Sequence, residues 1–414
     1  MKVLYLAWSA SNKTRAGHLH WIPKSLLEYR GAVEFTVAVL RTCSLRSALP
    51  ILNPKAYLRG FDFQDFQMAV TEAQVISEEA AKREISQVVI YEGAMFELQV
   101  ATQLARLNPQ MSIIVNLFAA QKWADYLRSA DESTLASLRM RFNQESNLFL
   151  TAETDGLSNV IAEKLGWKPK VFPVFTTLDY QLERGKSLSS LDISETTRDK
   201  ICISVGSEHH FEFLIELLSR LRGRVDMRSV RLILQARGGF KRCHSRKLRK
   251  LGINSNQVLR GNLSPEDYAS TLSSSILILF TYDSKKYLLK SSGRVQDALL
   301  LGCVPVVSSG TALPSQIWQA GNESIHTYQD CSASSAFKEI IEVLSSSKRN
   351  LHAIRVSEFT EWLLEIAAES KSPTGVMIDS WRKTAYMPKN NFSDRRNFRF
   401  RISSELVRLG LLRP

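Results

Sequence analysis

The sequence predicts an α/β protein built from two Rossmann-like, doubly wound domains that face a cleft. Short apolar runs alternate with amphipathic segments along most of the 414 residues, and the alternation stops and restarts once, around residues 179–200. Strands buried on both faces give such runs, and strand–helix alternation is typical of parallel sheets. The chain also exceeds the length at which one core usually keeps growing. We therefore expect two sheets, with the carboxyl ends of their strands lining the cleft.

The first alternation covers residues 1–178, the predicted N-terminal domain. Each apolar run of four to six residues has the length of a buried strand, and most are followed by a segment with helical periodicity. Residues 45–67 are rich in aromatic side chains without a clear period, and we expect a loop there. The predicted strands are residues 3–7, 35–40, 88–91, 112–116, 148–152 and 171–175, and the predicted helices are 21–29, 75–84, 96–107, 123–138 and a segment ending at 165.

Residues 179–200 are rich in Ser, Lys, Glu and Thr, which predicts an exposed linker. The alternation then restarts in a second domain, residues 201–371. A basic and aromatic tail, residues 372–414, completes the chain. The predicted strands of the second domain are residues 201–205, 230–234, 257–259, 276–280, a strand ending at 307 and 324–328, and the predicted helices are 211–221, a basic segment at 237–250, 265–272, 295–301 and 336–344.

The charge of the chain predicts an anionic partner. The formal net charge is +13 and the pI is about 9.5, which leaves nucleic acid, an anionic membrane surface or a phosphate-bearing substrate. Five cysteines without C-x-x-C spacing argue against a disulfide scaffold and a structural zinc site, and fit a reducing compartment. No run approaches the roughly 20 apolar residues of a spanning helix. We expect a cytoplasmic protein that is soluble or peripheral at the inner face of the membrane.

A candidate anion site lies between residues 287 and 307. Ser291, Ser292 and Gly293 come directly before a predicted helix, and a helix start presents free backbone N–H groups and the positive end of the helix dipole. Arg294 adds a positive charge. Asp297, one turn into the helix, can accept hydrogen bonds from two hydroxyl groups. Phosphate plus sugar hydroxyls is the predicted ligand, and an ordinary helix with a good N-terminus is the alternative.

Three segments of the second domain carry a family resemblance. They are VRLILQARGG (230–239), VLRGNLSPEDY (258–268) and DALLLGCVPVV (297–307). Together they resemble the donor domain of GT-B fold glycosyltransferases, most nearly the large retaining group numbered family four. The resemblance implies that Asp297 binds the ribose of a nucleotide-sugar, that residues 291–293 bind its diphosphate, and that Val258 borders the base. In the first domain it implies roles for Gly17 near the phosphate and for His18 or Glu92 near the sugar or acceptor.

Two positions depart from the family pattern. Leu289 stands where the family has the first of two acidic residues, and residues 204–210 offer no Arg or Lys where the family has a basic pair. A departing diphosphate requires cations or N–H donors at its developing charge. We expect this charge to be met by four residues on nearby loops: Arg237, Lys241, Lys290 and Arg294.

The predicted function is transfer of a sugar from a nucleoside diphosphate donor to an acceptor hydroxyl. The resemblance implies retention of configuration, no metal and no further cofactor, a glycan or lipid-linked acceptor, and a place in polysaccharide or glycoconjugate synthesis. Two alternatives remain open: a nucleotide-sugar epimerase on the same fold, and a module that binds a phosphorylated ligand or a membrane without turnover. Arg and Phe alternate in the tail, and we expect it to pack back on the first domain; membrane contact is the alternative, and no nucleic-acid module accompanies it.

Overall fold

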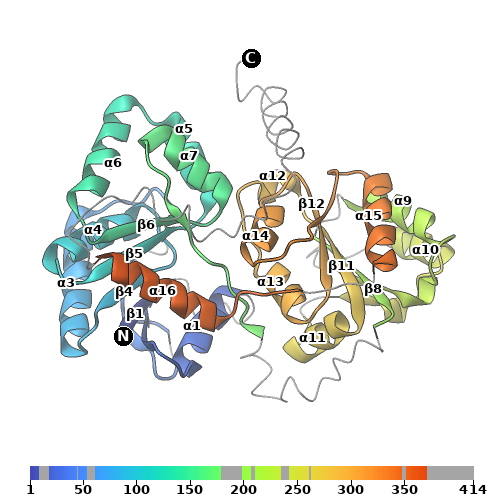
Figure 1. The fold of residues 1–414 in the computed structure, drawn as a ribbon, viewed down its shortest axis with the longest axis horizontal. Helices are drawn as coiled ribbons and strands as arrows, with labels where there is room; N and C mark the ends of the chain where they lie inside the picture. The colour runs from blue at the N-terminus through green and yellow to red at the C-terminus, as the bar shows by residue number, and fades with distance from the viewer. Residues whose placement is uncertain are drawn as a thin grey trace. The chain divides into compact units, whose positions relative to one another are not determined.

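The computed structural model describes residues 1–8, 18–43, 45–53, 61–178, 198–206, 210–234, 242–260, 263–346 and 351–370. The predicted tail and almost all of the predicted linker lie outside these ranges. Met1–Lys371 form one compact unit, and the description below concerns this unit (Figure 1). No helix in the described ranges is long and apolar enough to cross a membrane.

The first sheet has seven strands in the order β3-β2-β1-β4-β5-β6-β7, and every neighbouring pair is parallel. The strand order reverses between β1 and β4, which is where open α/β sheets bind their ligands. Four of the strands are buried along nearly their whole length. The strands are β1 (Lys2–Ala7), β2 (Glu34–Leu40), β3 (Leu49–Leu52), β4 (Gln87–Ile90), β5 (Ser112–Leu117), β6 (Leu148–Ala152) and β7 (Lys170–Val171).

The second sheet has six parallel strands in the order β10-β9-β8-β11-β12-β13. Its strand order reverses between β8 and β11. Two parallel, doubly wound sheets confirm the predicted fold class. The strands are β8 (Lys200–Val205), β9 (Val230–Leu234), β10 (Val258–Arg260), β11 (Ser275–Thr281), β12 (Val304–Ser308) and β13 (His326–Tyr328).

Alternate residues of the first sheet feed two separate cores. Leu4 and Leu6 pack against the group of helices α3 to α7, whereas Val3 and Tyr5 pack against α1 and α16, because successive side chains of a strand point to opposite faces. Helices therefore cover both faces, which is why the strands are apolar throughout. The helices are α1 (His18–Glu28), α3 (Phe66–Lys82), α4 (Met95–Leu107), α5 (Ala120–Ser129), α6 (Glu132–Gln144), α7 (Asp155–Leu165) and α16 (Val356–Ser370).

The second sheet is covered in the same way. Ile203 packs on the side of α9, α10 and α15, and its neighbour Cys202 packs on the side of α11, α13 and α14. Figure 1 shows α9, α10 and α15 together on one side of this sheet. The helices are α9 (Phe211–Leu221), α10 (Arg242–Lys250), α11 (Pro265–Ser273), α12 (Ser284–Tyr287), α13 (Gly293–Leu300), α14 (Leu313–Gln319) and α15 (Ala333–Ser345).

Two local predictions were wrong. The stretch predicted as a loop contains strand β3, which pairs with β2. The single helix predicted at 123–138 is two helices, because Asp131 caps a new helix by accepting a 2.8 Å hydrogen bond from the backbone N–H of Thr134. Helix α16 falls within the predicted second domain, yet Phe359 and Leu363 lie in the core of the first sheet. The exact domain boundaries stay a prediction.

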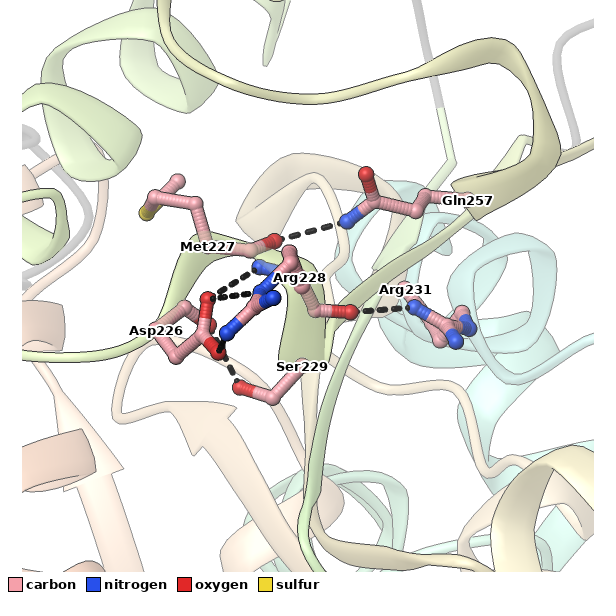
Figure 2. A network of polar contacts seen from close by, with 6 residues as sticks. All are labelled: Asp226, Met227, Arg228, Ser229, Arg231 and Gln257. Atoms are coloured by element: carbon pink, nitrogen blue, oxygen red, sulfur yellow. Dashed lines mark hydrogen bonds and ion pairs between the residues drawn. The ribbon is translucent and has the colours of Figure 1, made fainter.

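A polar network holds the amino ends of β9 and β10 (Figure 2). The side-chain amide of Gln257 donates to the carbonyl oxygens of Met227 (2.6 Å) and Val230 (2.9 Å). Arg231 donates to the carbonyl oxygen of Arg228 (2.8 Å), and Asp226 accepts from the backbone N–H of Arg228 (2.9 Å). This network has a structural role, because the strands run parallel and a ligand site is expected at their opposite, carboxyl ends.

Candidate active site

The predicted anion loop lies directly before α13, as the sequence predicts, but its donors already have partners. Ser291 donates to Oε1 of Glu153 from its backbone N–H (3.2 Å) and from its hydroxyl (2.9 Å). The backbone N–H of Ser292 donates to the side-chain oxygen of Gln316 (2.9 Å). A carboxylate from the first half of the chain therefore occupies the position at which we expected a phosphate.

Glu153 comes directly after β6, at the carboxyl edge of the first sheet. Its side chain is buried, and Oε2 also accepts a 3.4 Å hydrogen bond from the backbone N–H of Ala120. Burial raises the pKa of this carboxyl, while the hydrogen bonds from Ser291 and Ala120 and the charge of Lys290 oppose the rise. The predicted site residues do not include Glu153. An acid directly after a buried strand is the signal that could have found it.

Leu289, where the family resemblance calls for an acid, is an apolar anchor. It is buried and belongs to the core cluster of the first sheet. Its carbonyl oxygen accepts a 3.0 Å hydrogen bond from the hydroxyl of Thr154. A methyl group built on Gly156 would lie 2.5 Å from Cδ2 of Leu289, so the loop lies directly against the start of α7. An ionised side chain at this position would have to be buried among apolar groups, which is costly.

Asp297 is held from the segment that follows β7. The hydroxyl of Thr176 donates a 2.7 Å hydrogen bond to Oδ1 of Asp297. Thr176 is fully buried, and its hydroxyl also accepts from the backbone N–H of Leu178 (3.1 Å), so its orientation is fixed. The structure therefore orients Asp297 before any ligand is present. Thr176 is a second residue that the sequence did not reveal.

Arg294 and Lys290 belong to one aromatic cluster. The Arg294 guanidinium lies 5.6 Å from the ring centre of Tyr268, and the Lys290 amine lies 5.6 Å from that of Tyr287. The rings of Tyr282 and Tyr287 stack at 4.1 Å. Neither cation forms an ion pair with a carboxylate in the part of the chain that the structure describes. Arg294 interacts electrostatically with Asp297 and Lys290 with Glu153, so both charges lie at the predicted anion loop.

The other predicted site residues are scattered or not described. Val258 opens β10 at the edge of the second sheet and is half-buried. His18 begins α1, but its side chain lies outside the described part of the chain. Gly17, Arg237 and Lys241 lie outside the described residues altogether.

A buried acidic pair lies beyond β4. Glu92 and Glu97 are both buried, and Glu97 accepts a 3.2 Å hydrogen bond from the backbone N–H of Ala94. Burial, with the nearby charge of Glu92, raises the pKa of Glu97 to about 7. Gly93 between them is fixed: its N–H donates to Asn116 (2.8 Å), and its carbonyl oxygen accepts from the indole of Trp123 (2.7 Å). The sequence indicated Glu92 and missed Glu97, which caps the start of α4 by accepting from the backbone of Ala94.

A shallow hollow lies at the carboxyl edge of the second sheet. Asp330 is held there by the hydroxyls of Ser284 (2.5 Å) and Ser308 (3.2 Å). Within the described ranges, no three His, Cys, Asp or Glu side chains are grouped as a metal site. The lining residues are His210, Phe213, Thr281, Tyr282, Tyr328, Asp330 and Cys331.

Comparison with known proteins identifies the fold and no family. No family model matches the chain, and no curated protein matches it. Among solved structures, a putative UDP-N-acetylglucosamine 2-epimerase from Listeria monocytogenes is 14% identical, with a TM-score of 0.50 over 89% of this chain and 96% of that one. The N-terminal domain of Candida albicans trehalose-6-phosphate phosphatase is 11% identical, with a TM-score of 0.53 over 89% and 92%.

A further UDP-N-acetylglucosamine 2-epimerase structure is 13% identical, with a TM-score of 0.50 over 91% of this chain and 98% of that one. These alignments run across both sheets, since they cover about nine tenths of the chain. At this level of identity they concern the fold alone. The chain thus has an α/β, GT-B-like fold, and its membership of the retaining family four stays a prediction.

Proposed function

We propose that the protein is an enzyme that acts on a nucleoside diphosphate sugar. The observation that carries the proposal is the arrangement around α13: a helix start at Ser291 and Ser292, whose N–H groups Glu153 and Gln316 engage in this structure, a carboxylate at Asp297 that Thr176 orients, and two nearby cations, Lys290 and Arg294. Donors and cations suit a diphosphate, and a carboxylate suits the two hydroxyls of a ribose.

For the reaction, we infer epimerisation of the sugar in preference to its transfer. Removal and return of a proton requires two groups whose pKa values differ and which lie close together. Glu92 and Glu97 are the candidate pair, because both are buried, the charge of Glu92 acts on Glu97, and the pKa of Glu97 is raised to about 7. The fold supports the proposal, since two of the similar structures bear the name UDP-N-acetylglucosamine 2-epimerase.

Glycosyl transfer is the second candidate, and the motif resemblance at 230–307 favours it. In that case Asp297, Ser291 and Gly293 bind the same donor, and the acceptor is a glycan or a lipid-linked sugar. Retention of configuration, a role in polysaccharide synthesis and a position at the cytoplasmic face of the membrane belong to this candidate. The basic charge of the chain supports the last of these.

One experiment separates the candidates. The protein is incubated with UDP-N-acetylglucosamine and other nucleotide-sugars in D₂O, and the products are followed by NMR and by release of nucleoside diphosphate. Epimerisation exchanges the proton at the inverted carbon for deuterium without an acceptor. Transfer releases nucleoside diphosphate only when an acceptor is added, for instance with membranes. A protein that binds the nucleotide-sugar but yields neither signal is the non-catalytic module.

Glu97→Gln tests the proposed acid–base pair. As a base, Glu97 acts in its deprotonated form, so the rate should rise with pH to a plateau above about pH 7. The variant should lose about 10²-fold or more in rate while binding the nucleotide-sugar with little change. An unchanged rate would remove Glu97 from the reaction.

A further inference from the structure

The contact between Ser291 and Glu153 has the geometry of an anion site that is already filled. Oε1 of Glu153 accepts from the backbone N–H of Ser291 (3.2 Å) and from its hydroxyl (2.9 Å). A serine at a helix start binds a phosphate oxygen in the same way, by donating to it from both its backbone N–H and its hydroxyl. The two residues are 138 positions apart in sequence, so the contact is a product of the tertiary structure.

Glu153 cannot turn away into solvent within this arrangement. Its side chain is 4% exposed, and its second oxygen accepts from the backbone N–H of Ala120 (3.4 Å). No Arg or Lys of the described residues forms an ion pair with it. The charge is balanced by hydrogen bonds and by the more distant amine of Lys290.

The groups that face Glu153 determine how it titrates. Lys290, on the loop before α13, stabilises the charged form. Tyr91 beyond β4 and Tyr287 of α12 also interact with Glu153 electrostatically. Both are neutral at physiological pH, as phenols ordinarily are, and burial raises their pKa values further. Burial likewise raises the pKa of Glu153 above its ordinary value.

A diphosphate and an ionised Glu153 compete for the same donors. Both are anions that can only accept hydrogen bonds, and the backbone N–H of Ser291 can donate to only one of them. The two negative charges would also repel each other in a buried site. A protonated carboxyl does not compete in this way, because its O–H can donate to a phosphate oxygen. Protonation therefore changes Glu153 from a competitor into a donor.

We propose that Glu153 is a residue of the diphosphate site, and that nucleotide-sugar binding beside Ser291 requires the protonated form of its carboxyl. The inference rests on the proposed function, since it takes Ser291 as a diphosphate ligand. It makes binding pH-dependent with a definite sign. Above the pKa of Glu153 in the free protein, affinity falls as pH rises, by up to about tenfold per pH unit for one bound proton. Below that pKa, affinity is constant.

The experiment measures UDP-N-acetylglucosamine binding to the full chain by isothermal titration calorimetry between about pH 5 and pH 8. Both phosphates of this diester stay singly charged over that range, so the ligand does not contribute to the pH dependence. Repeating each titration in buffers with different ionisation enthalpies gives the number of protons taken up. We expect uptake of up to one proton, and an affinity that falls with pH.

The matched variants are Glu153→Gln and Asp155→Asn. The glutamine side chain keeps the shape and the acceptor oxygen of Glu153 but carries no charge. The Glu153→Gln protein should therefore bind UDP-N-acetylglucosamine without proton uptake and, at pH 8, at least tenfold more tightly than the wild type. Asp155, two residues along, instead accepts from Ser315 and Gln319, so its variant should keep the wild-type pH dependence. Thermal unfolding of each variant confirms that it folds.

Each result has a definite meaning. If the wild type binds UDP-N-acetylglucosamine with the same affinity at every pH and takes up no proton, the proposal is overturned and the proposed function stands. Loss of binding in a folded Glu153→Gln protein would overturn the competition, because it would make the carboxylate itself a required ligand. If Glu153→Gln does not fold, proton uptake by the wild type decides alone. No binding by wild type or variant at any pH would overturn the proposed function together with this inference.

Discussion

Thr176 donates a 2.7 Å hydrogen bond to Asp297 across 121 positions of sequence. The backbone N–H of Thr176 also donates to the carbonyl oxygen of Ile354 (2.9 Å), and the N–H of Ile354 donates to the side chain of Gln296 (2.8 Å). Residues 172–178 and 351–356 both connect elements of the first sheet with elements of the second. Both connecting segments are therefore hydrogen-bonded to adjacent residues of α13, Asp297 and Gln296.

Replacing Thr176 tests this orientation of Asp297. Thr176→Val keeps the shape but removes the donor, and we expect UDP to bind about 1 kcal/mol more weakly, which is about fivefold in Kd. Thr176→Ser retains the hydroxyl and should restore most of the affinity. Calorimetric titration with UDP gives both values. Equal affinities for the Val and Ser variants would mean that the hydrogen bond does not matter for the ligand.

Asp297→Ala tests the ribose contact itself. Loss of a charged hydrogen bond to a hydroxyl should weaken UDP binding by about 1 to 3 kcal/mol. Inorganic pyrophosphate has no ribose, so its binding should be unchanged in the same variant. If the variant weakens pyrophosphate as much as UDP, Asp297 acts on the whole loop rather than on a sugar hydroxyl.

The buried acid Glu97 should make stability pH-dependent. Its pKa is raised from 4.5 to about 7 in the folded protein, so between these values the folded state holds a proton that the unfolded state has released. The free energy of unfolding should therefore fall as pH rises through this window, by about 3 kcal/mol from this group. In the Glu97→Gln protein, the free energy of unfolding should fall less over the same pH range, by that amount. Urea unfolding of both proteins at about pH 5 and pH 8 measures the difference.

A double mutant cycle tests how Leu289 packs on α7. Leu289→Ala should lower the free energy of unfolding by about 2 to 4 kcal/mol, because it empties a buried position. Gly156→Ala should be destabilising alone, since its new methyl group meets Leu289, and neutral or stabilising when combined with Leu289→Ala. We expect a coupling energy of about 1 to 3 kcal/mol. Additive effects would show that the two residues do not touch in solution.

Patterns local to a strand or helix were enough to predict the fold class. Buried strands such as β1 and β5 show their character in uninterrupted apolar runs. Strand β3 was missed because it is four residues long and contains Pro50, which gives a weak strand signal. The break between α5 and α6 was missed although Asp131 is a typical helix-capping residue, because the helical period continues across it.

Only the part of the site formed by α13 and the loop before it was predictable from the sequence. The helix start at Ser292 and the acid one turn later are local signals, and the structure has both. The partners of these residues come from distant parts of the chain: Glu153 for Ser291, Thr176 for Asp297 and the core of the first sheet for Leu289. No periodicity records contacts of this kind, which depend on how two separate sheets are joined. The leucine that departs from the family pattern is explained by this packing rather than by chemistry.

The place of α16 has a consequence for how the protein is made. The second sheet has all its strands and α15 once residue 345 has been synthesised. The first sheet, although its strands come first from the ribosome, still lacks Phe359, Trp362 and Leu363 at that moment, so the face of β1 that carries Val3 and Tyr5 is only partly covered, by α1. The half that is translated first is thus completed last. A chain truncated before residue 356 should expose part of this apolar sheet face to chaperones.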